Sequence, residues 1–152
     1  MTPDPELIEV EPTTTAVIRG VVPMTEITTF YDRSFTEVAT VIGRQGRSPL
    51  GAFGLYLAPP ADVIELEVGF VVDGEVEPAG DVVPSSLPGG RVARLVHHGA
   101  YDGLGEAWGG LMAWVSDQGL TPAGAMWEVY VTEPTPETDP ASLRTDLFCP
   151  VR

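Results

Sequence analysis

Residues 118–131 (QGLTPAGAMWEVYV) decide the fold, because an earlier stretch, residues 45–57 (QGRSPLGAFGLYL), follows the same pattern. In both stretches a Gln-Gly pair leads through a proline into a β-rich run, at residues 53–57 and 127–131. A helical pattern precedes each lead-in, and a β-rich run precedes each helical pattern. Such an internal repeat predicts a two-lobed fold, and a cleft at the seam is typical of two-lobed folds. The copies differ at one charged position, since Gly54 in the first copy is Glu128 in the second.

Each copy predicts the order strand, helix, strand, strand. In the first copy, apolar residues recur at helical spacing over 25–42, and β-rich runs occupy 14–22, 53–57 and 63–72. In the second copy, Asp102 is placed to cap a helix over 104–115, and the strands are expected at 91–97, 127–132 and 144–151. A further short strand is expected at 7–10. Residues 73–90 read as a linker in which 81–83 can pair briefly.

Helices on one face of an antiparallel sheet define the α+β class. We expect a single domain over residues 1–152, with repeat halves at about 6–72 and 81–152. The two strand-helix-strand-strand modules should form a curved antiparallel sheet with two helices and a pseudo-two-fold ligand cleft.

The composition narrows the classes of partner. The formal net charge is −14, and this disfavours direct binding of nucleic acid while it concentrates cationic small molecules near the protein. All basic residues are arginines, and the lack of lysine excludes Schiff-base chemistry and a P-loop. No apolar run approaches the roughly 20 residues that cross a bilayer, and no signal peptide is visible. With its single cysteine, Cys149, the chain is expected to be cytoplasmic and to have no membrane partner.

Glu128 is the main candidate for a binding residue. Strand alternation points Glu128 and Tyr130 to one face, and Trp127 with its alternate neighbours to the other face, which we expect to meet the helix. Tyr56 holds the place of Tyr130 in the first copy, where Gly54 is expected to leave room. A carboxylate among tyrosines suits an organic cation, because each ring adds cation–π attraction of about 0.5–2 kcal/mol.

Other residues carry weaker signals. His97 and His98 are adjacent on a strand and face opposite ways, so we expect no metal site. The glycines from Gly103 to Gly110 lack the spacing of a dinucleotide fingerprint, and we expect no cofactor. Cys149 reads as a buried thiol. Trp108 lies in the first half of its helix, where it can line the cleft.

Several motifs together resemble a known family. They are residues 96–104 (VHHGAYDGL), Trp114, residues 119–120, 122–124 and 127–130 (WEVY), and residues 144–148 (RTDLF). This combination resembles the GyrI-like small-molecule-binding domain, the effector-binding domain of multidrug-sensing transcription regulators, in its stand-alone form. The resemblance implies a ligand cleft between two modules and an acidic residue that meets lipophilic cations.

Carried over residue by residue, the resemblance matches Glu128 to the family's glutamate and Tyr130 to the aromatic residue two positions on. Phe148 stands where the family often has tyrosine, and Asp146 replaces a more usual glutamate. The expected ligand-binding residues are Glu128, Tyr130, Tyr56, Phe148, Trp108 and Tyr101.

Three functions remain open at this point. The first is a binder that senses or sequesters lipophilic, cationic compounds. The second is a hydrolase of cyclopropane-bearing, DNA-alkylating natural products, in which Glu128 is the general base and Tyr130 assists. The third is a gyrase-inhibitory interaction protein, whose acidic surface meets a basic partner protein.

Overall fold

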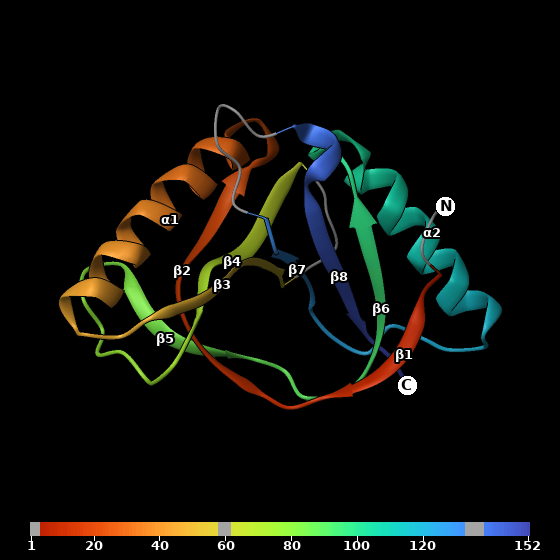
Figure 1. Cartoon of the computed structure of the whole chain (residues 1–152), viewed down its shortest axis with the longest axis horizontal. Helices are drawn as coiled ribbons and strands as arrows, with labels where there is room; N and C mark the ends of the chain where they lie inside the picture. Colours follow the sequence, from red (N-terminus) through yellow and green to blue (C-terminus); the bar gives the residue numbers. More distant parts are fainter. Residues whose placement is uncertain (1–3, 58–61, 133–138) are drawn as a thin grey trace. The chain divides into compact units, whose positions relative to one another are not determined.

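The computed structural model describes residues 4–57, 62–132 and 139–152 (Figure 1). The chain forms two compact units. The N-terminal unit is Glu11–Gly89, and the C-terminal unit combines Met1–Val10 with Gly90–Arg152. Each unit contains antiparallel strands and one long helix, which confirms the predicted α+β class.

The N-terminal unit has the strand order β3-β4-β2-β5. Its elements are β2 (Thr13–Pro23), a 3-10 turn (Met24–Glu26), α1 (Ile27–Arg44), β3 (Pro49–Tyr56), β4 (Val63–Val72) and β5 (Val82–Leu87). Helix α1 covers β2 and β4 (Figure 1) and buries Phe30, Val38 and Ile42 against residues such as Ile18 and Leu66. The helical spacing read from the sequence therefore marks the face that forms this core.

The C-terminal unit has the strand order β1-β6-β8-β7. Its elements are β1 (Glu6–Val10), β6 (Gly90–His98), a 3-10 turn (Tyr101–Gly103), α2 (Leu104–Asp117), β7 (Met126–Tyr130), a 3-10 turn (Pro140–Ser142) and β8 (Arg144–Pro150). Leu111 and Val115 of α2 pack on Leu95 and Leu147 of the sheet. The predicted cap at Asp102 is wrong, because Asp102 lies in the 3-10 turn before the helix, and the N-cap position makes no side-chain bond.

The two Gln-Gly pairs end the two helices in the same way. Gly46 and Gly119 adopt positive φ angles of 71° and 73°. After α1, the backbone N–H of Arg47 donates to the carbonyl of Ile42, at 3.0 Å. After α2, the N–H of Leu120 donates to the carbonyl of Val115, at 3.1 Å. Both ends are Schellman motifs, in which glycine is favoured because it has no Cβ to clash. The sequence repeat is therefore also a repeat of hydrogen bonds.

Two strands pair across the predicted boundary between the halves. The three-stranded core of each unit, β3-β4-β2 or β7-β8-β6, leaves one side of β2 or β6 open. Strand β5 fills the open side of β2, with Thr15 opposite Ser85, and β1 fills the open side of β6, with Glu6 opposite Arg94. The strand that precedes each repeat thus joins the sheet of the other repeat. The compact units differ from the predicted halves at these two strands.

No helix in the described part of the chain has the length and apolar character needed to cross a membrane. The cleft expected at the seam of the halves stays a prediction. The candidate site is described within the C-terminal unit.

Candidate functional site

The carboxylate of Glu128 on β7 is buried, and two aromatic side chains donate to it. Trp108 of α2 donates from Nε1 to Oε1 at 2.6 Å, and the hydroxyl of Tyr130 donates to Oε2 at 2.5 Å. Glu128 is only 5% exposed. Both carboxylate oxygens are therefore fixed by donors that carry no positive charge, and hydrogen bonds to a charged acceptor are shorter and stronger than neutral ones.

The prediction for the faces of β7 is wrong. Because Trp108 lies on α2, Glu128 points to the helix side of the sheet, and its neighbour on β8, Leu147, belongs to the core beneath α2. Trp127 instead stacks on Phe148, with ring centroids 5.2 Å apart and planes 10° apart. The two sets of side chains alternate as predicted, but the helix side carries Glu128 and not the bulkier apolar residues. The indole N–H of Trp108 makes a carboxylate tolerable on the helix side.

Tyr101 extends the aromatic surroundings of Glu128. Its ring lies edge-on to the ring of Tyr130, with centroids 5.8 Å apart. Burial and, secondarily, the negative charge of Glu128 raise the pKa of Tyr101. Tyr101 is still 38% exposed, so this ring connects the buried carboxylate to solvent. We call Glu128, Trp108, Tyr130 and Tyr101 the Glu128 site.

Among the described residues three carboxylates are buried, those of Glu67, Asp146 and Glu128, and Glu128 differs from the other two because no cation pairs with it. Arg19 pairs with Glu67, and Arg94 and Arg144 both pair with Asp146. Within the described residues no arginine lies within ion-pair distance of Glu128. The described residues stabilise its negative charge through hydrogen bonds and not through an ion pair, so a cationic ligand would gain from the uncompensated charge.

The corresponding position in the N-terminal unit is filled by a tyrosine. An ideal Cβ built on Gly54 would lie 2.1 Å from the hydroxyl oxygen of Tyr31, so the expected room is absent. The hydroxyls of Tyr31, on α1, and Tyr56, on β3, are 2.9 Å apart and hydrogen-bonded. Tyr31 is the residue that sequence reasoning missed. Tyr31 lies on α1, and its side chain reaches Gly54. Residue spacing alone does not reveal this contact between helix and strand.

The structure brings together four of the six predicted ligand-binding residues: Glu128, Tyr130, Trp108 and Tyr101. Phe148 stacks on Trp127 on the opposite face of the sheet, and Tyr56 lies in the N-terminal unit. Within the described residues Phe148 contacts Trp127 and Tyr56 contacts Tyr31, so for these two residues ligand binding stays a prediction.

The structure gives His97 and Cys149, the other candidates from the sequence, local contacts within the fold. Ring atom Nε2 of His97 is 3.0 Å from the carbonyl of Ala100 and hydrogen-bonds to it. Cys149 is fully buried, as predicted, and burial raises its pKa to about 11. Within the described residues no group of three or more His, Cys, Asp or Glu side chains is arranged to hold a metal ion.

The sequence matches the GyrI-like small molecule binding domain over residues 3–152, and the chain belongs to this family. The resemblance carried by the WEVY and RTDLF motifs is thereby confirmed. No curated protein matches the chain in sequence.

Solved structures share the fold at low sequence identity. The C-terminal domain of EcmrR is 21% identical, with a TM-score of 0.87 over 100% of this chain and 99% of that one. In an EcmrR–DNA complex, at 22% identity and a TM-score of 0.85, 99% of this chain spans 58% of the EcmrR chain. SAV2435 bound to tetraphenylphosphonium is 12% identical, with a TM-score of 0.71 over 98% and 94% of the chains. A hydrolase encoded by lin2189 from Listeria innocua is 12% identical, with a TM-score of 0.65 over 99% and 93%.

Proposed function

We propose that this domain senses or sequesters lipophilic organic cations, and that Glu128 is the residue that recognises their charge. The observation that carries the proposal is the buried Glu128 carboxylate, which lies among three aromatic side chains and forms no ion pair with an arginine of the described residues. Tetraphenylphosphonium, the ligand of the similar SAV2435 structure, is a cation of this class.

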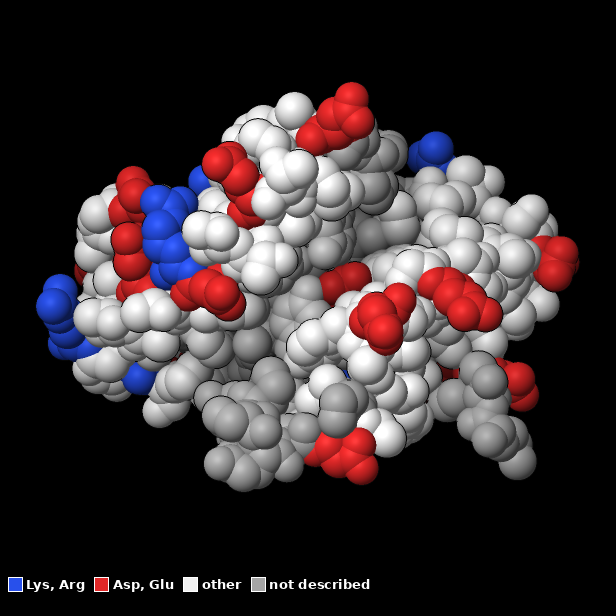
Figure 2. Space-filling view, turned by 90° about the horizontal axis from the view of Figure 1, so that it is seen from above, with Lys and Arg blue, Asp and Glu red and all other residues white. Residues whose placement is uncertain are grey.

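The energetics favour a cation over a neutral ligand. Removing a carboxylate from water costs several kcal/mol, and hydrogen bonds to a charged group return about 1.5–3 kcal/mol each. A positive charge about 5 Å away adds roughly 3 kcal/mol at an effective dielectric constant of about 20. The rings add contact area and cation–π attraction. The surface charge assists, because acidic side chains are scattered over the face shown in Figure 2 and few basic ones accompany them.

The test is a titration with tetraphenylphosphonium, monitored by calorimetry and by intrinsic tryptophan fluorescence, to which Trp108 contributes. We expect saturable binding to the wild type and an increase in Kd of roughly a hundredfold in Glu128→Gln, which corresponds to the Coulomb energy above. Glutamine keeps the size of the side chain and removes its charge. Thermal melting of the variant checks that the fold is retained.

Two controls isolate the charge of Glu128. Glu106→Gln removes an exposed carboxylate of α2 and should leave Kd nearly unchanged. Triphenylphosphine oxide, which is aromatic but neutral, should bind weakly and equally to the wild type and Glu128→Gln. Equal affinity of wild type and a folded Glu128→Gln for tetraphenylphosphonium would show that Glu128 does not recognise the cation.

A second candidate function is hydrolysis of an electrophilic, cyclopropane-bearing compound. The observation in its favour is a carboxylate beside two phenols, Tyr130 and Tyr101, which is a general base next to potential acids. Product analysis after incubation with such a compound separates the candidates. Turnover beyond one equivalent that disappears in Glu128→Gln supports catalysis, whereas protection at one equivalent supports sequestration.

A further inference from the structure

The outer side of β2 is covered by β5 over only part of its length. Pairing with β5 runs from Thr13 opposite Leu87 to Ile18 opposite Val82, whereas pairing with β4 continues to Pro23. Within the described residues, 19–23 therefore have a strand partner on one side only. A tight turn explains where β5 begins, because the N–H and carbonyl groups of Ala79 and Val82 bond to each other at 3.0 Å. Gly80, at a φ of 61°, allows the turn.

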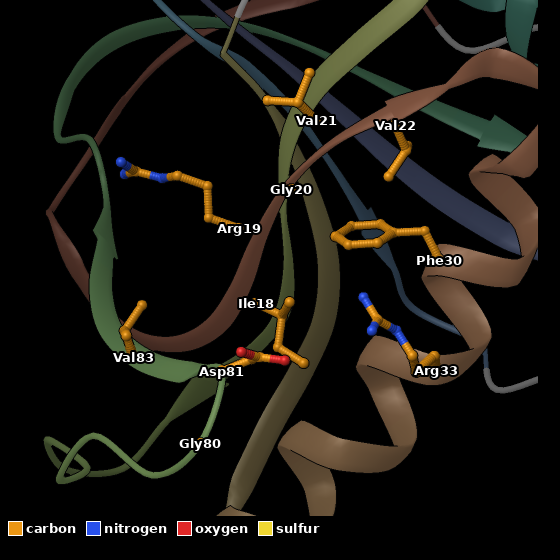
Figure 3. A pocket seen from close by; sticks show the side chains of 10 residues that line it. All are labelled: Ile18, Arg19, Gly20, Val21, Val22, Phe30, Arg33, Gly80, Asp81 and Val83. Atoms are coloured by element: carbon orange, nitrogen blue, oxygen red, sulfur yellow. The ribbon is translucent and has the colours of Figure 1, made fainter.

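A hollow of about 690 Å³ lies at this uncovered edge (Figure 3). Its lining combines β2 with α1 and with the start of β5: Ile18, Arg19, Gly20, Val21, Val22, Phe30, Arg33, Gly80, Asp81 and Val83. Successive residues of β2 point to opposite faces of the sheet, and both sets contribute. The hollow therefore lies along the part of β2 that β5 leaves uncovered, where a further strand would run.

We propose that this edge binds an extended peptide of another protein, which adds to β2 as a further strand and places a carboxylate on Arg33. Unpaired backbone groups at a strand edge are a ready template for such addition. Main-chain hydrogen bonds to residues 19–22 supply affinity, and the side chains around the hollow supply selectivity.

The charges indicate what the peptide carries. The Arg33 guanidinium lies 5.7 Å from the centre of the Phe30 ring, and the described residues place no carboxylate within ion-pair distance of it. Arg19, the other cation of the hollow, is already bound to Glu67. Asp81 lines the hollow as its one acidic side chain. Arg33 is therefore the cation available to an acidic residue of the peptide.

The opposite face of the hollow selects apolar side chains. Val21 is 65% exposed and Val83 is 38% exposed, so an apolar side chain that covers them removes apolar area from water. The side chains of an added strand alternate between the two faces. The preferred peptide thus alternates an acidic residue, directed to Arg33, with β-branched apolar residues directed to Val21 and Val83.

A second copy of this chain fits the edge poorly. Two hollows that face each other leave a void, and Pro23 lacks the N–H that edge pairing uses. The same features explain how the edge stays open without aggregation.

The test is selection of phage-displayed random peptides on the immobilised full chain, followed by fluorescence anisotropy with the enriched peptides. We expect enrichment of sequences with an acidic residue between β-branched residues. Arg33→Glu should weaken their binding at least about tenfold, and hydrogen exchange of the amides at residues 19–22 should slow when peptide is bound. The matched control is Arg91→Glu, the same charge reversal at an exposed position of the C-terminal unit, which should bind as the wild type does.

Glu128→Gln should leave peptide binding unchanged, so this inference and the proposed function fail or succeed separately. Failure to enrich any peptide overturns the proposal. Enriched peptides that bind equally well to Arg33→Glu, or that leave the exchange of residues 19–22 unchanged, overturn it as well.

Discussion

Replacement of Gly54 by alanine tests how tightly Tyr31 fills the place that Glu128 holds in the other repeat. The added Cβ would lie 2.1 Å from the hydroxyl oxygen of Tyr31 and 2.9 Å from its Cζ. Gly54 is buried in β3 and paired with Val68 of β4, so the tyrosine has to move rather than the strand. Displacement breaks the hydrogen bond to Tyr56, worth about 1 kcal/mol, and overpacking adds about 1–3 kcal/mol. We expect a total loss of about 2–4 kcal/mol.

The assay is urea unfolding of the wild type, Gly54→Ala, Tyr31→Phe and the double variant. Tyr31→Phe alone should cost about 1 kcal/mol, because it removes the hydrogen bond. In the double variant the closest clash is gone, so its loss should be smaller than the sum of the single losses by about 1 kcal/mol. Gly109→Ala is the control, because nothing lies within 4 Å of its added Cβ and alanine favours the helix by about 1 kcal/mol. A cost below about 0.5 kcal/mol for Gly54→Ala, or strict additivity, would refute the assigned packing.

Three further predictions concern the stability of the fold. The folded pKa of Cys149, about 11, is above its ordinary value of 9.0. The buried neutral thiol therefore stabilises the fold fully below pH 9, and this stabilisation is lost as pH rises to 11. The difference in free energy of unfolding between wild type and Cys149→Ala, measured in urea, should change by about 3 kcal/mol over this range. Arg19→Met leaves Glu67 buried, with Ser85 as its one side-chain donor among the described residues; urea unfolding should show a loss of about 1–3 kcal/mol, and adding Glu67→Gln should recover part of it. Deletion of residues 1–10 removes β1 and the Glu6 partner of Arg94; hydrogen exchange should accelerate in β6 while the amides of α1 keep their protection.

Much of the fold follows from local pattern. The period of the apolar residues locates α1 and α2, and the β-rich runs locate seven of the eight strands in the described part of the chain, within a few residues. Strand β5 escapes clear recognition because Pro84 and Ser85 interrupt its apolar pattern. Proline is tolerated there because β5 is an edge strand, which pairs with β2 on one side. The local pattern does not predict which strands pair, because pairing joins segments that are far apart in the sequence.

The candidate site is predictable in identity but not in orientation. Comparison of the repeats identifies Glu128, because a carboxylate replaces Gly54 in an apolar run. The predicted helix-facing side of β7 is wrong, since periodicity alone cannot reveal that the indole N–H of Trp108 on α2 lies within hydrogen-bond distance of Glu128. Tyr31 was missed for the same reason. Both errors involve a polar bond between a helix and a strand, which is set by packing rather than by sequence spacing.

Because β1 pairs with β6 and β5 pairs with β2, the two units can fold at different times during synthesis. The N-terminal unit is one continuous segment, so it can fold once residue 89 has emerged from the ribosome. Strand β1 is synthesised before the other described strands, but Glu6 cannot pair until Arg94, 88 positions later, has been made. At about 5–20 residues per second, β1 stays unpaired for several seconds on a translating ribosome. The first of the described strands is thus among the last to pair.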